Sequence, residues 1–397
     1  MTCNFKILLA ILLVTFFGSR TQAQQSTFKS IVATIQSVQK QLAPDKRVAV
    51  LEVSLEDTLQ PVVKIKGETN LPDGRKQILQ LFDAKGIRYV DSIRLLPTAL
   101  IGDKTWGLAS LSASNLRTKP DHAAELASQV LMGTPMKILD YVDGWYRVQT
   151  PDFYIGWMDS GGLARFTDSE MDRWKKSNRY VFSQITGNAF DSTNRKKSKV
   201  SDLVLGDLFE VEAEIKGYLK IRFPDGRTGF VKKKDCLSFQ EWTSRKPDVQ
   251  SVLNIAKQLL GVPYLWGGTS CKAVDCSGFT KTAYYSQGII LARDSSQQAK
   301  YGQHPGFNEI GNLQPGDLLF FGRSDQRVTH VGIYLENGWY IHASSAFGRV
   351  HVNSIDPKNQ EYVLTEKKKL VAVSRILNSL NTEGIVLVKD HPWYSLP

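Results

Sequence analysis

Cysteine is scarce in this sequence: the 397 residues include only four. Cys3 precedes an apolar segment at the N-terminus, and the others are Cys236, Cys271 and Cys276. A small disulfide-stabilised scaffold would carry a denser, even set, so packing must hold this fold together. The three cysteines beyond the N-terminal segment are an odd number, which indicates a reactive thiol. Cys236 and Cys271 could pair and leave Cys276 free, but sequence alone does not show that their backbones approach each other.

Long apolar runs are also missing. The run from Ile7 to Phe17 has eleven residues, whereas a membrane-spanning helix needs about 20. Lys6 precedes this run, and small and polar residues follow it up to Ala23, an order typical of a secretory signal peptide. We therefore expect residues 1–23 to be cleaved from an exported protein, periplasmic or secreted, without a transmembrane anchor. Cys3 lies on the wrong side of the run for lipid attachment.

Acidic residues are fewer than basic ones, 39 against 50, and the formal net charge is +11. Cleavage would remove Lys6 and Arg20 and no acid, which lowers +11 to about +9. Such an excess suits an anionic wall polymer or membrane surface, or serves solubility alone. No basic patch interleaved with aromatic residues indicates a nucleic-acid partner. Because no Cys or His pair has C-x-x-C or H-x-x-x-H spacing, we expect no metal, and no cofactor either.

The chain reads as a multidomain α+β protein, and its first segment mixes helical and strand patterns. Residues 28–42 repeat apolar positions at three and four, which predicts an amphipathic helix. Strands, a second helix and a last strand are then expected, at 48–55, 62–66, 70–83 and 89–95. The order α-β-β-α-β predicts a small α+β domain over residues 24–103, without a recognisable catalytic cluster.

From about residue 105, short strands broken by Gly, Pro and Asp predict small all-β modules. A glycine-aromatic pattern at Gly144-Trp145 and Gly156-Trp157 returns, more degenerate, at Gly217-Tyr218 and Gly229-Phe230. This internal echo predicts tandem copies of one β module. The pair resembles bacterial SH3-like domains, which in wall enzymes bind or position peptidoglycan. By this resemblance they occupy residues 104–165 and 176–241.

Cys276 stands in Asp275-Cys276-Ser277-Gly278, just before a segment over 280–287 that reads as a helix ended by Gly288. A cysteine at a helix N-terminus faces the positive end of the backbone dipole and unpaired N–H groups, which favour the thiolate. The alternative is a buried structural cysteine. The flanking Asp and Ser argue against an apolar burial site, so Cys276 is the predicted nucleophile.

Histidine is scarce as well, with six residues. Four of them lie in poor positions for a general base: a β-module loop, a turn, a strand without a partner motif and a segment from Lys389 to Pro397 that reads as a loose tail. These four are His122, His304, His351 and His391. The remaining two, His330 and His342, lie on predicted strands joined by the hairpin signal Asn337-Gly338.

The register of this hairpin decides whether the two histidines can act together. A two-residue loop of Asn337 and Gly338 alone would place His330 and His342 on opposite faces. A three-residue loop or a bulge would place His342 opposite Gly332 and diagonal to His330. A Cys-His-His triad requires the second register.

Several motifs together resemble the NlpC-type family of papain-like cell-wall cysteine peptidases, over residues 246–388. The motifs are Asp275-Cys276-Ser277-Gly278, Gly316 to Phe321, His330-Val331-Gly332-Ile333-Tyr334, the following His342, and Gly261 to Gly268. The resemblance implies that Cys276 attacks, His330 is the base and His342 orients it. It also implies that the hydroxyl of Tyr264 lies beside the oxyanion, where it and the N–H of Cys276 could stabilise negative charge.

The combination of export, two SH3-like modules and this catalytic domain is similar to γ-D-glutamyl-L-diamino acid endopeptidases. These hydrolyse the bond between γ-D-Glu and L-Lys or diaminopimelate in peptidoglycan stem peptides whose L-Ala amine is free. The similarity implies an amine site with Asp275, Glu125 and Tyr154. It also implies a D-Glu subsite with Trp266, Ser277 and Ser295.

Two other functions stay open at this point. One is a wall-binding protein with an inert C-terminal domain, although Cys276, His330 and His342 are all present. The other is acyl transfer, because papain-like folds host both transfer and hydrolysis. For Glu125 and Tyr154 the alternative is a solvated acid and a packed aromatic. Ala292 replaces the proline that the family usually carries, a difference that concerns loop stiffness.

Overall fold

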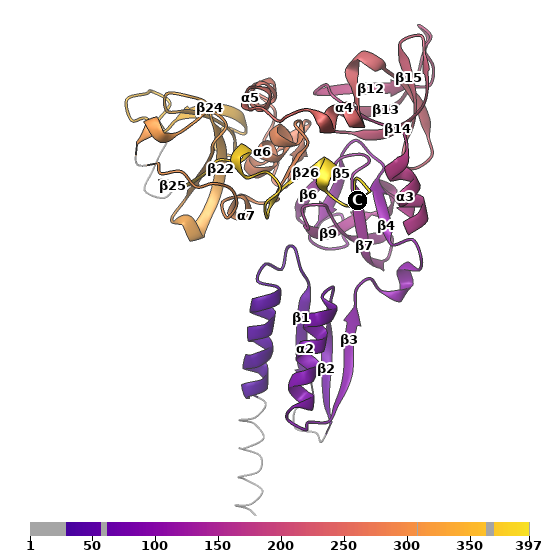
Figure 1. Ribbon diagram of the computed structural model, residues 1–397, viewed down its shortest axis with the longest axis vertical. Helices are drawn as coiled ribbons and strands as arrows, with labels where there is room; N and C mark the ends of the chain where they lie inside the picture. The colour runs from indigo at the N-terminus through magenta and orange to yellow at the C-terminus, as the bar shows by residue number, and fades with distance from the viewer. Residues whose placement is uncertain (1–28, 57–61, 308, 363–368, 397) are drawn as a thin grey trace, which may run out of the picture. The chain divides into compact units, whose positions relative to one another are not determined.

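The computed structural model describes residues 29–56, 62–307, 309–362 and 369–396 and divides into two units, residues 1–99 and 100–397 (Figure 1). The predicted signal peptide, residues 1–23, lies outside the described residues. Within the described ranges, no helix is both long enough and apolar enough to cross a bilayer.

The first unit is a three-stranded sheet with two helices. In chain order it contains a helix over 29–42, β1 Leu51–Glu56, β2 Val63–Thr69, α2 Pro72–Asp83 and β3 Tyr89–Leu95. β1 and β2 are antiparallel, and β2 and β3 are parallel because α2 carries the chain back across the sheet. Ile31 and Phe82 from the helices share one apolar core with Ile65 from the sheet. The predicted α-β-β-α-β order is confirmed.

The second unit begins with two seven-stranded sheets that share one strand order. The first contains β4 Trp106–Ala109, β5 Ser114–Arg117, β6 Leu126–Val130, β7 Pro135–Val142, β8 Trp145–Gln149, β9 Ile155–Asp159 and β10 Leu163–Phe166. The second contains β11 Arg179–Phe182, β12 Thr186–Phe190, β13 Lys199–Val204, β14 Leu208–Ile215, β15 Tyr218–Arg222, β16 Thr228–Lys232 and β17 Cys236–Ser238. The orders are β10-β4-β7-β8-β9-β5-β6 and β17-β11-β14-β15-β16-β12-β13. They match strand for strand, which confirms the tandem copies.

The glycine-aromatic echo has a structural reason. The first pair of each copy, Gly144-Trp145 and Gly217-Tyr218, marks a tight hairpin, β7 to β8 and β14 to β15. The second pair lies within β9 and β16. The two turn residues have positive φ in both hairpins, 44° and 86° at Asp143 and Gly144, and 51° and 78° at Lys216 and Gly217. This is the conformation of a type I′ turn, which favours glycine at its second position. The aromatic residue then begins the next strand.

Two helices frame the second sheet in the chain. α3 Asp168–Lys176 begins with a capping box, in which Thr167 and Glu170 exchange side-chain and backbone hydrogen bonds. α4 Phe239–Ser244 begins with the same device at Ser238 and Glu241.

The last part of the second unit combines helices with a five-stranded antiparallel sheet. Its helices are α5 Val249–Gln258, α6 Cys276–Tyr285 and α7 Ser295–Gln298. The sheet has the order β24-β23-β22-β21-β25, with β21 Leu318–Gly322, β22 Val328–Tyr334, β23 Trp339–Ser344, β24 Arg349–Ser354 and β25 Lys369–Ser374. Two short pairs complete it, β18 Thr269–Ser270 with β19 Ala273–Val274, and β20 Ile289–Leu291 with β26 Ile385–Leu387. α6 packs on β22, with Phe279 in one core with Val331 and Ile333.

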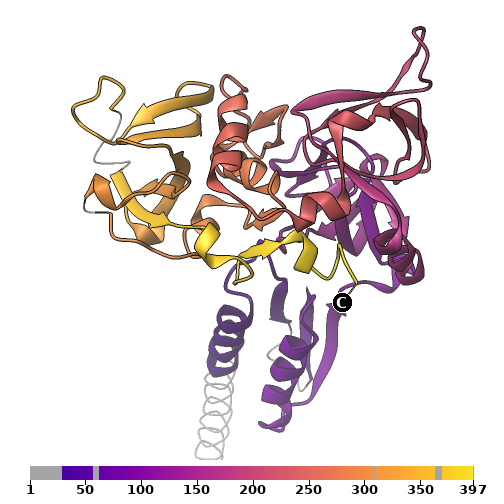
Figure 2. The same cartoon turned by 45° about the horizontal axis from the view of Figure 1, so that its top comes forward.

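Residues 388–396 are not the loose tail expected from the sequence, and we call them the C-terminal clasp. Val388, His391 and Tyr394 are buried, and the ring of Trp393 meets that of Trp106 edge to face at 5.6 Å. The clasp therefore joins the catalytic part to the first β module (yellow in Figure 2). The expectation was wrong because nine residues show no helix or strand periodicity, although their aromatic side chains bury apolar surface.

Candidate active site

Cys276 is the first residue of α6, and Asp275 caps the helix. The N–H of Gly278 donates to Oδ1 of Asp275 at 2.7 Å, and the N–H of Gly267 donates to Oδ2 at 3.0 Å. A Cβ on Gly278 would lie 1.9 Å from the backbone oxygen of Gly268. The glycines here thus allow the loop to approach the helix start closely, which positions Cys276.

Arg293 is a buried partner of this helix start that the sequence analysis did not single out. Its side chain is 1% exposed, and it pairs with Asp275 through Nη2 to Oδ2 at 2.6 Å and Nη1 to Oδ1 at 3.2 Å. Nη1 also donates to Ser277 Oγ at 3.0 Å, and Nε donates to Ser128 Oγ at 2.9 Å. A buried ion pair is tolerated only when its polar atoms are satisfied. Because Ser128 belongs to β6, Arg293 ties the catalytic helix to the first β module.

Burial raises the pKa of the Cys276 thiol to about 12, and the neighbouring Asp275 carboxylate acts in the same direction. The N–H groups of Val331 and Ser277 and the Arg293 guanidinium lower it. The N–H of Ser277 at the helix start lowers the pKa, as expected, but the loss of solvent outweighs this effect. The thiol needs a base to take its proton.

The two candidate histidines lie on one face of the sheet. Ile333 pairs with Ile341 and Tyr334 with Tyr340, so the hairpin has the three-residue loop that the triad requires. Nε2 of His330 lies 2.5 Å from Nδ1 of His342. β22 also brings the N–H of Val331 to the Cys276 thiol, because it packs against α6. Of the two registers that the sequence allows, the structure has the one that the triad requires.

Tyr264 lies beside the same thiol. The pKa of its hydroxyl is raised above the usual value, first by burial and then by the neighbouring Cys276 and Asp275. Its N–H donates to the backbone oxygen of Gly348 at 2.8 Å, and its backbone bridges to Val274. The hydroxyl is thus held near the sulfur by backbone contacts on both sides.

The predicted substrate-binding residues divide between the catalytic part and the first β module. Nε1 of Trp266 donates to Oε1 of Glu125 at 2.6 Å, and the hydroxyl of Tyr154 donates to Oδ2 of Asp294 at 3.3 Å. Trp266 and Glu125 are exposed, whereas Tyr154 is buried in the β-module core and presents only its hydroxyl.

Ser277 and Ser295 are both buried. The hydroxyl of Ser277 is engaged, because it donates to Oδ1 of Asp275 at 3.1 Å and accepts from Arg293. Ser295 is the first residue of α7, whose N-cap is Asp294. Asp294 stands directly before Ser295 in the chain, but no local pattern gave it a role.

Sequence models of two known domain families match this chain, one over the residues around Cys276 and one over the first β module. The sequence model of the NlpC/P60 family matches residues 261–369, and that of the bacterial dipeptidyl-peptidase Sh3 domain matches residues 116–163. Residues 261–369 therefore form an NlpC/P60 domain. The protein is accordingly a hydrolase, a cysteine peptidase of that kind, and its β modules include a bacterial SH3-like domain.

Several curated relatives share this arrangement over most of their length. Dipeptidyl-peptidase 6 of Lysinibacillus sphaericus is 29% identical over 262 residues, which cover 63% of this chain and 91% of the relative. The gamma-D-glutamyl-L-lysine dipeptidyl-peptidase of Bacillus subtilis is 25% identical over 295 residues, 72% of this chain and 91% of the relative. The crystal structure of an NlpC/P60 family protein from Bacillus cereus superposes with a TM-score of 0.59 at 23% identity, over 68% of this chain and 99% of that one. It shows that the fold is shared.

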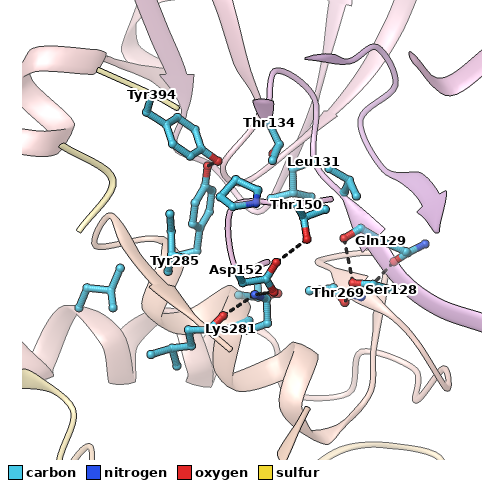
Figure 3. Close-up of a pocket in the computed structure, with 16 residues that line it drawn as sticks. Ser128, Gln129, Leu131, Thr134, Thr150, Asp152, Thr269, Lys281, Tyr285 and Tyr394 are labelled. Carbon is cyan, nitrogen blue, oxygen red and sulfur yellow. Dashed lines mark hydrogen bonds and ion pairs between the residues drawn. The ribbon is translucent and has the colours of Figure 1, made fainter. Parts of the chain in front are cut away.

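The NlpC/P60 domain and the first SH3-like module meet through a buried polar interface (Figure 3). Nζ of Lys281, on α6, lies 2.6 Å from Oδ2 of Asp152 and donates to the backbone oxygen of Leu291 at 2.5 Å. Thr150 donates to the other oxygen of Asp152. A cavity of about 70 Å³ lies beside this pair. The segment 150–154, which carries Tyr154, is therefore tied to the catalytic helix.

The described part of the chain contains no group of three His, Cys, Asp or Glu side chains arranged to hold a metal ion. Cys236, Cys271 and Cys276 all have free thiols, so Cys236 and Cys271 are not paired.

Proposed function

We propose that this protein is an exported γ-D-glutamyl-L-diamino acid endopeptidase. It hydrolyses the bond between γ-D-Glu and L-Lys or diaminopimelate in peptidoglycan-derived stem peptides, and it prefers stems whose N-terminal L-Ala carries a free amine. The observation that carries this proposal is the contact of Glu125 and Tyr154, from the SH3-like module, with Trp266 and Asp294 of the NlpC/P60 domain. The Bacillus subtilis relative named gamma-D-glutamyl-L-lysine dipeptidyl-peptidase supports it.

The proposed mechanism uses Cys276, His330 and Tyr264. His330 accepts the thiol proton as the sulfur attacks the γ-carbonyl carbon of D-Glu. The N–H of Cys276, which has no acceptor within the helix, and the hydroxyl of Tyr264 stabilise the oxyanion. His330 then gives its proton to the leaving amine of the diamino acid, which leaves a thioester. Water hydrolyses the thioester with His330 again as base and restores the thiol.

The amine site requires one change from the sequence-based assignment. Asp275 was expected to bind the substrate ammonium group, but its two oxygens already accept from the Gly278 and Gly267 N–H groups and from Arg293. We assign this role instead to Asp294, whose carboxylate lies next to the Tyr154 hydroxyl and is 27% exposed. Asp294, Glu125 and Tyr154 then form the amine site.

The D-Glu subsite keeps Trp266 and Ser295 as its proposed lining. Trp266 is 63% exposed and lies two residues after Tyr264 in the chain, and an exposed indole held by Glu125 offers a flat apolar wall. Ser277 contributes through Asp275 and Arg293, because its hydroxyl is engaged by both.

The decisive experiment compares L-Ala-γ-D-Glu-L-Lys with its N-acetyl form. Acetylation removes the ammonium charge and leaves the carboxylates of the amine site unpaired, at a cost of about 2–5 kcal/mol. We expect kcat/KM for the acetylated peptide to be at least ~30-fold lower. Mass spectrometry should show L-Ala-γ-D-Glu and L-Lys as the products, and no adducts when amine acceptors are added. Comparable kcat/KM values for both peptides would rule out the proposed amine site. Adducts with the added amines would indicate acyl transfer instead of hydrolysis.

A further inference from the structure

We propose that Asn353 is a positioning residue of the catalytic centre: its amide, held by Glu361, decides which ring nitrogens of His342 and His330 carry protons. The inference deepens the proposed function, because it rests on the roles assigned to Cys276, His330 and His342.

Asn353 lies on β24, on the same sheet face as the two histidines. In the pairing of β23 with β24, Tyr340 lies opposite Asn353 and His342 opposite His351. Asn353 is fully buried, and its Oδ1 is 2.8 Å from Nε2 of His342. His342 therefore has a polar neighbour on each ring nitrogen, His330 at Nδ1 and Asn353 at Nε2.

Glu361 fixes the orientation of the Asn353 amide. Nδ2 of Asn353 lies 3.3 Å from both the backbone oxygen and Oε2 of Glu361. That backbone oxygen is itself held in place, because it accepts from the N–H of Ser354 at 3.0 Å. A carbonyl oxygen only accepts hydrogen bonds, so the NH2 group must face Glu361 and Oδ1 must face His342. A flipped amide would set acceptor against acceptor at Glu361.

The orientation of the Asn353 amide determines which nitrogen carries the proton in His342 and, through it, in His330. Since Oδ1 of Asn353 accepts, Nε2 of His342 carries a proton, and in the neutral ring its Nδ1 is then an acceptor. Nε2 of His330, 2.5 Å away, must donate to it. This leaves Nδ1 of His330 as the nitrogen with the lone pair, the form required to accept a proton from Cys276. No ring has to change tautomer before the reaction.

The same order serves the charged state. When His330 becomes an imidazolium, its Nε2–H bond to His342 becomes charge-assisted and stronger. The chain continues through Asn353 to the Glu361 carboxylate, whose negative end faces the NH2 group. The positive charge is thus stabilised by dipoles that are already aligned.

The test compares Asn353→Leu and Asn353→Asp with wild type, with Asn359→Ala as the matched control. Asn359 donates at 2.8 Å to Oγ of Ser354, the residue that follows Asn353 in the chain. Asn359 takes no part in the proposed proton order. NMR of imidazole nitrogens in ¹⁵N-histidine-labelled full-length protein reads the tautomers, and steady-state kinetics on L-Ala-γ-D-Glu-L-Lys gives kcat and KM against pH.

We expect wild-type His342 and His330 to be protonated at Nε2 only. Asn353→Leu should mix the tautomers and lower kcat by about 10- to 100-fold with little change in KM. Asn353→Asp keeps an acceptor for His342, so it should retain the tautomer, keep more activity than Asn353→Leu, and move the acid limb of the pH profile upward because it adds a negative charge. Asn359→Ala should match wild type.

A purely structural role for Asn353 gives the opposite order. The carboxylate introduced by Asn353→Asp would face the oxygens of Glu361, so this variant would then be no better than Asn353→Leu, and the proposal would be overturned. A wild-type His342 ring protonated at Nδ1 would also overturn the proposal, and this measurement does not depend on whether a variant folds. The NMR result also stands apart from the choice of substrate, so failure to cleave stem peptides would reject only the proposed function.

Discussion

Burial raises the pKa of Cys236, Cys271 and Cys276 alike to about 12, so neighbours rather than acidity distinguish the proposed nucleophile. Cys236 donates to the backbone oxygen of Lys232 at 3.6 Å, a contact within its own β module. Of the three, Cys276 lies at a helix N-terminus, against the strand that carries His330. A buried thiol with a base beside it reacts only when that base takes its proton.

Replacing Cys276 with Ala should abolish turnover and leave the fold intact, because no other group can form the covalent intermediate. Mass spectrometry of stem-peptide digests measures turnover, and circular dichroism measures the fold. Cys271→Ala is the control, since that thiol is buried in the same core and has no role in the proposed mechanism, and it should retain activity. Normal turnover in Cys276→Ala would rule out the assigned nucleophile.

The raised pKa of Cys276 predicts a characteristic pH dependence of thiol alkylation. Below a pKa of about 12, the thiolate fraction rises about tenfold with each pH unit. The iodoacetamide rate at Cys276 should therefore climb steadily between neutral and mildly alkaline pH, as measured by peptide mass spectrometry. A rate that is flat across neutral pH would instead show a thiolate paired with a protonated histidine in the resting enzyme.

His330 and His342 should differ in how strongly their loss reduces activity. Replacing His330 with Ala removes the base, whereas replacing His342 with Ala removes only the group that orients it, so kcat should fall further in the first variant. Parallel kinetics on one peptide substrate measures both. The reverse order would exchange the two roles.

The residues that the sequence analysis missed share one property. Arg293, Asp294 and Asn353 act through partners on other elements, such as Arg293 with Ser128 of the SH3-like module. Cys276, His330 and His342 could be selected from local signals, because a helix start and a hairpin place them. Arg293 and Asp294 have partners more than a hundred residues away, Ser128 and Tyr154, which leave no local signal. Asn353 lies only 11 residues after His342, but their contact depends on the pairing of β23 with β24.

At the scale of elements, the β22–β23 hairpin determines how His330 and His342 lie relative to each other, and Gly332 lies opposite His342 in this hairpin. A Cβ on Gly332 would lie 2.8 Å from Cδ2 of Tyr340 and 3.1 Å from Cβ of His342. The three-residue loop makes Gly332 the position opposite His342, so its missing side chain provides the space for the orienting ring. The sequence is compatible with both registers, because the loop length that selects one depends on tertiary packing.

Gly332→Ala should therefore reduce activity strongly, although it adds only one methyl group. Overpacking costs about 1–3 kcal/mol of folding free energy, and displacement of the His342 ring should lower kcat about tenfold or more. Chemical denaturation and kinetics measure the two effects. Gly311→Ala is the control, because a Cβ there meets nothing within 4 Å. If both variants behave alike, the hairpin tolerates the added methyl group.

At the scale of the whole second unit, two contacts hold the segment 150–154 that presents Tyr154. The Asp152–Lys281 pair ties it to α6, and the C-terminal clasp holds it from the other side. Nδ1 of His391 accepts from the N–H of Trp393 at 3.2 Å, so Nε2 carries the proton and donates to the backbone oxygen of Pro151 at 3.0 Å. Local patterns predicted the elements of both domains but not this long-range closure, which joins residues 240 apart in sequence.

The clasp should weaken in acid. Burial lowers the pKa of His391 below its usual 6.5, so the unfolded chain binds a proton more readily than the folded one. The stabilising contribution of His391 is then full above pH 6.5 and is lost as the pH falls toward the lowered value. Protonation of Nδ1 would also remove the acceptor for Trp393.

His391→Ala should consequently impair amine recognition more than catalysis. Without the clasp, the segment 150–154 loses the bond from His391 to Pro151, and a misplaced Tyr154 hydroxyl weakens the amine site by about tenfold. We expect kcat/KM for L-Ala-γ-D-Glu-L-Lys to fall by this factor, while the value for the N-acetyl peptide, which cannot use the amine site, stays the same. His304→Ala is the matched control, since His304 also bonds to a backbone oxygen, that of Val373 at 2.9 Å, away from the SH3-like module. If kcat/KM falls equally for both peptides, the clasp supports the fold as a whole. If the ratio of the two kcat/KM values and the melting temperature both stay unchanged, Tyr154 keeps its place without the clasp.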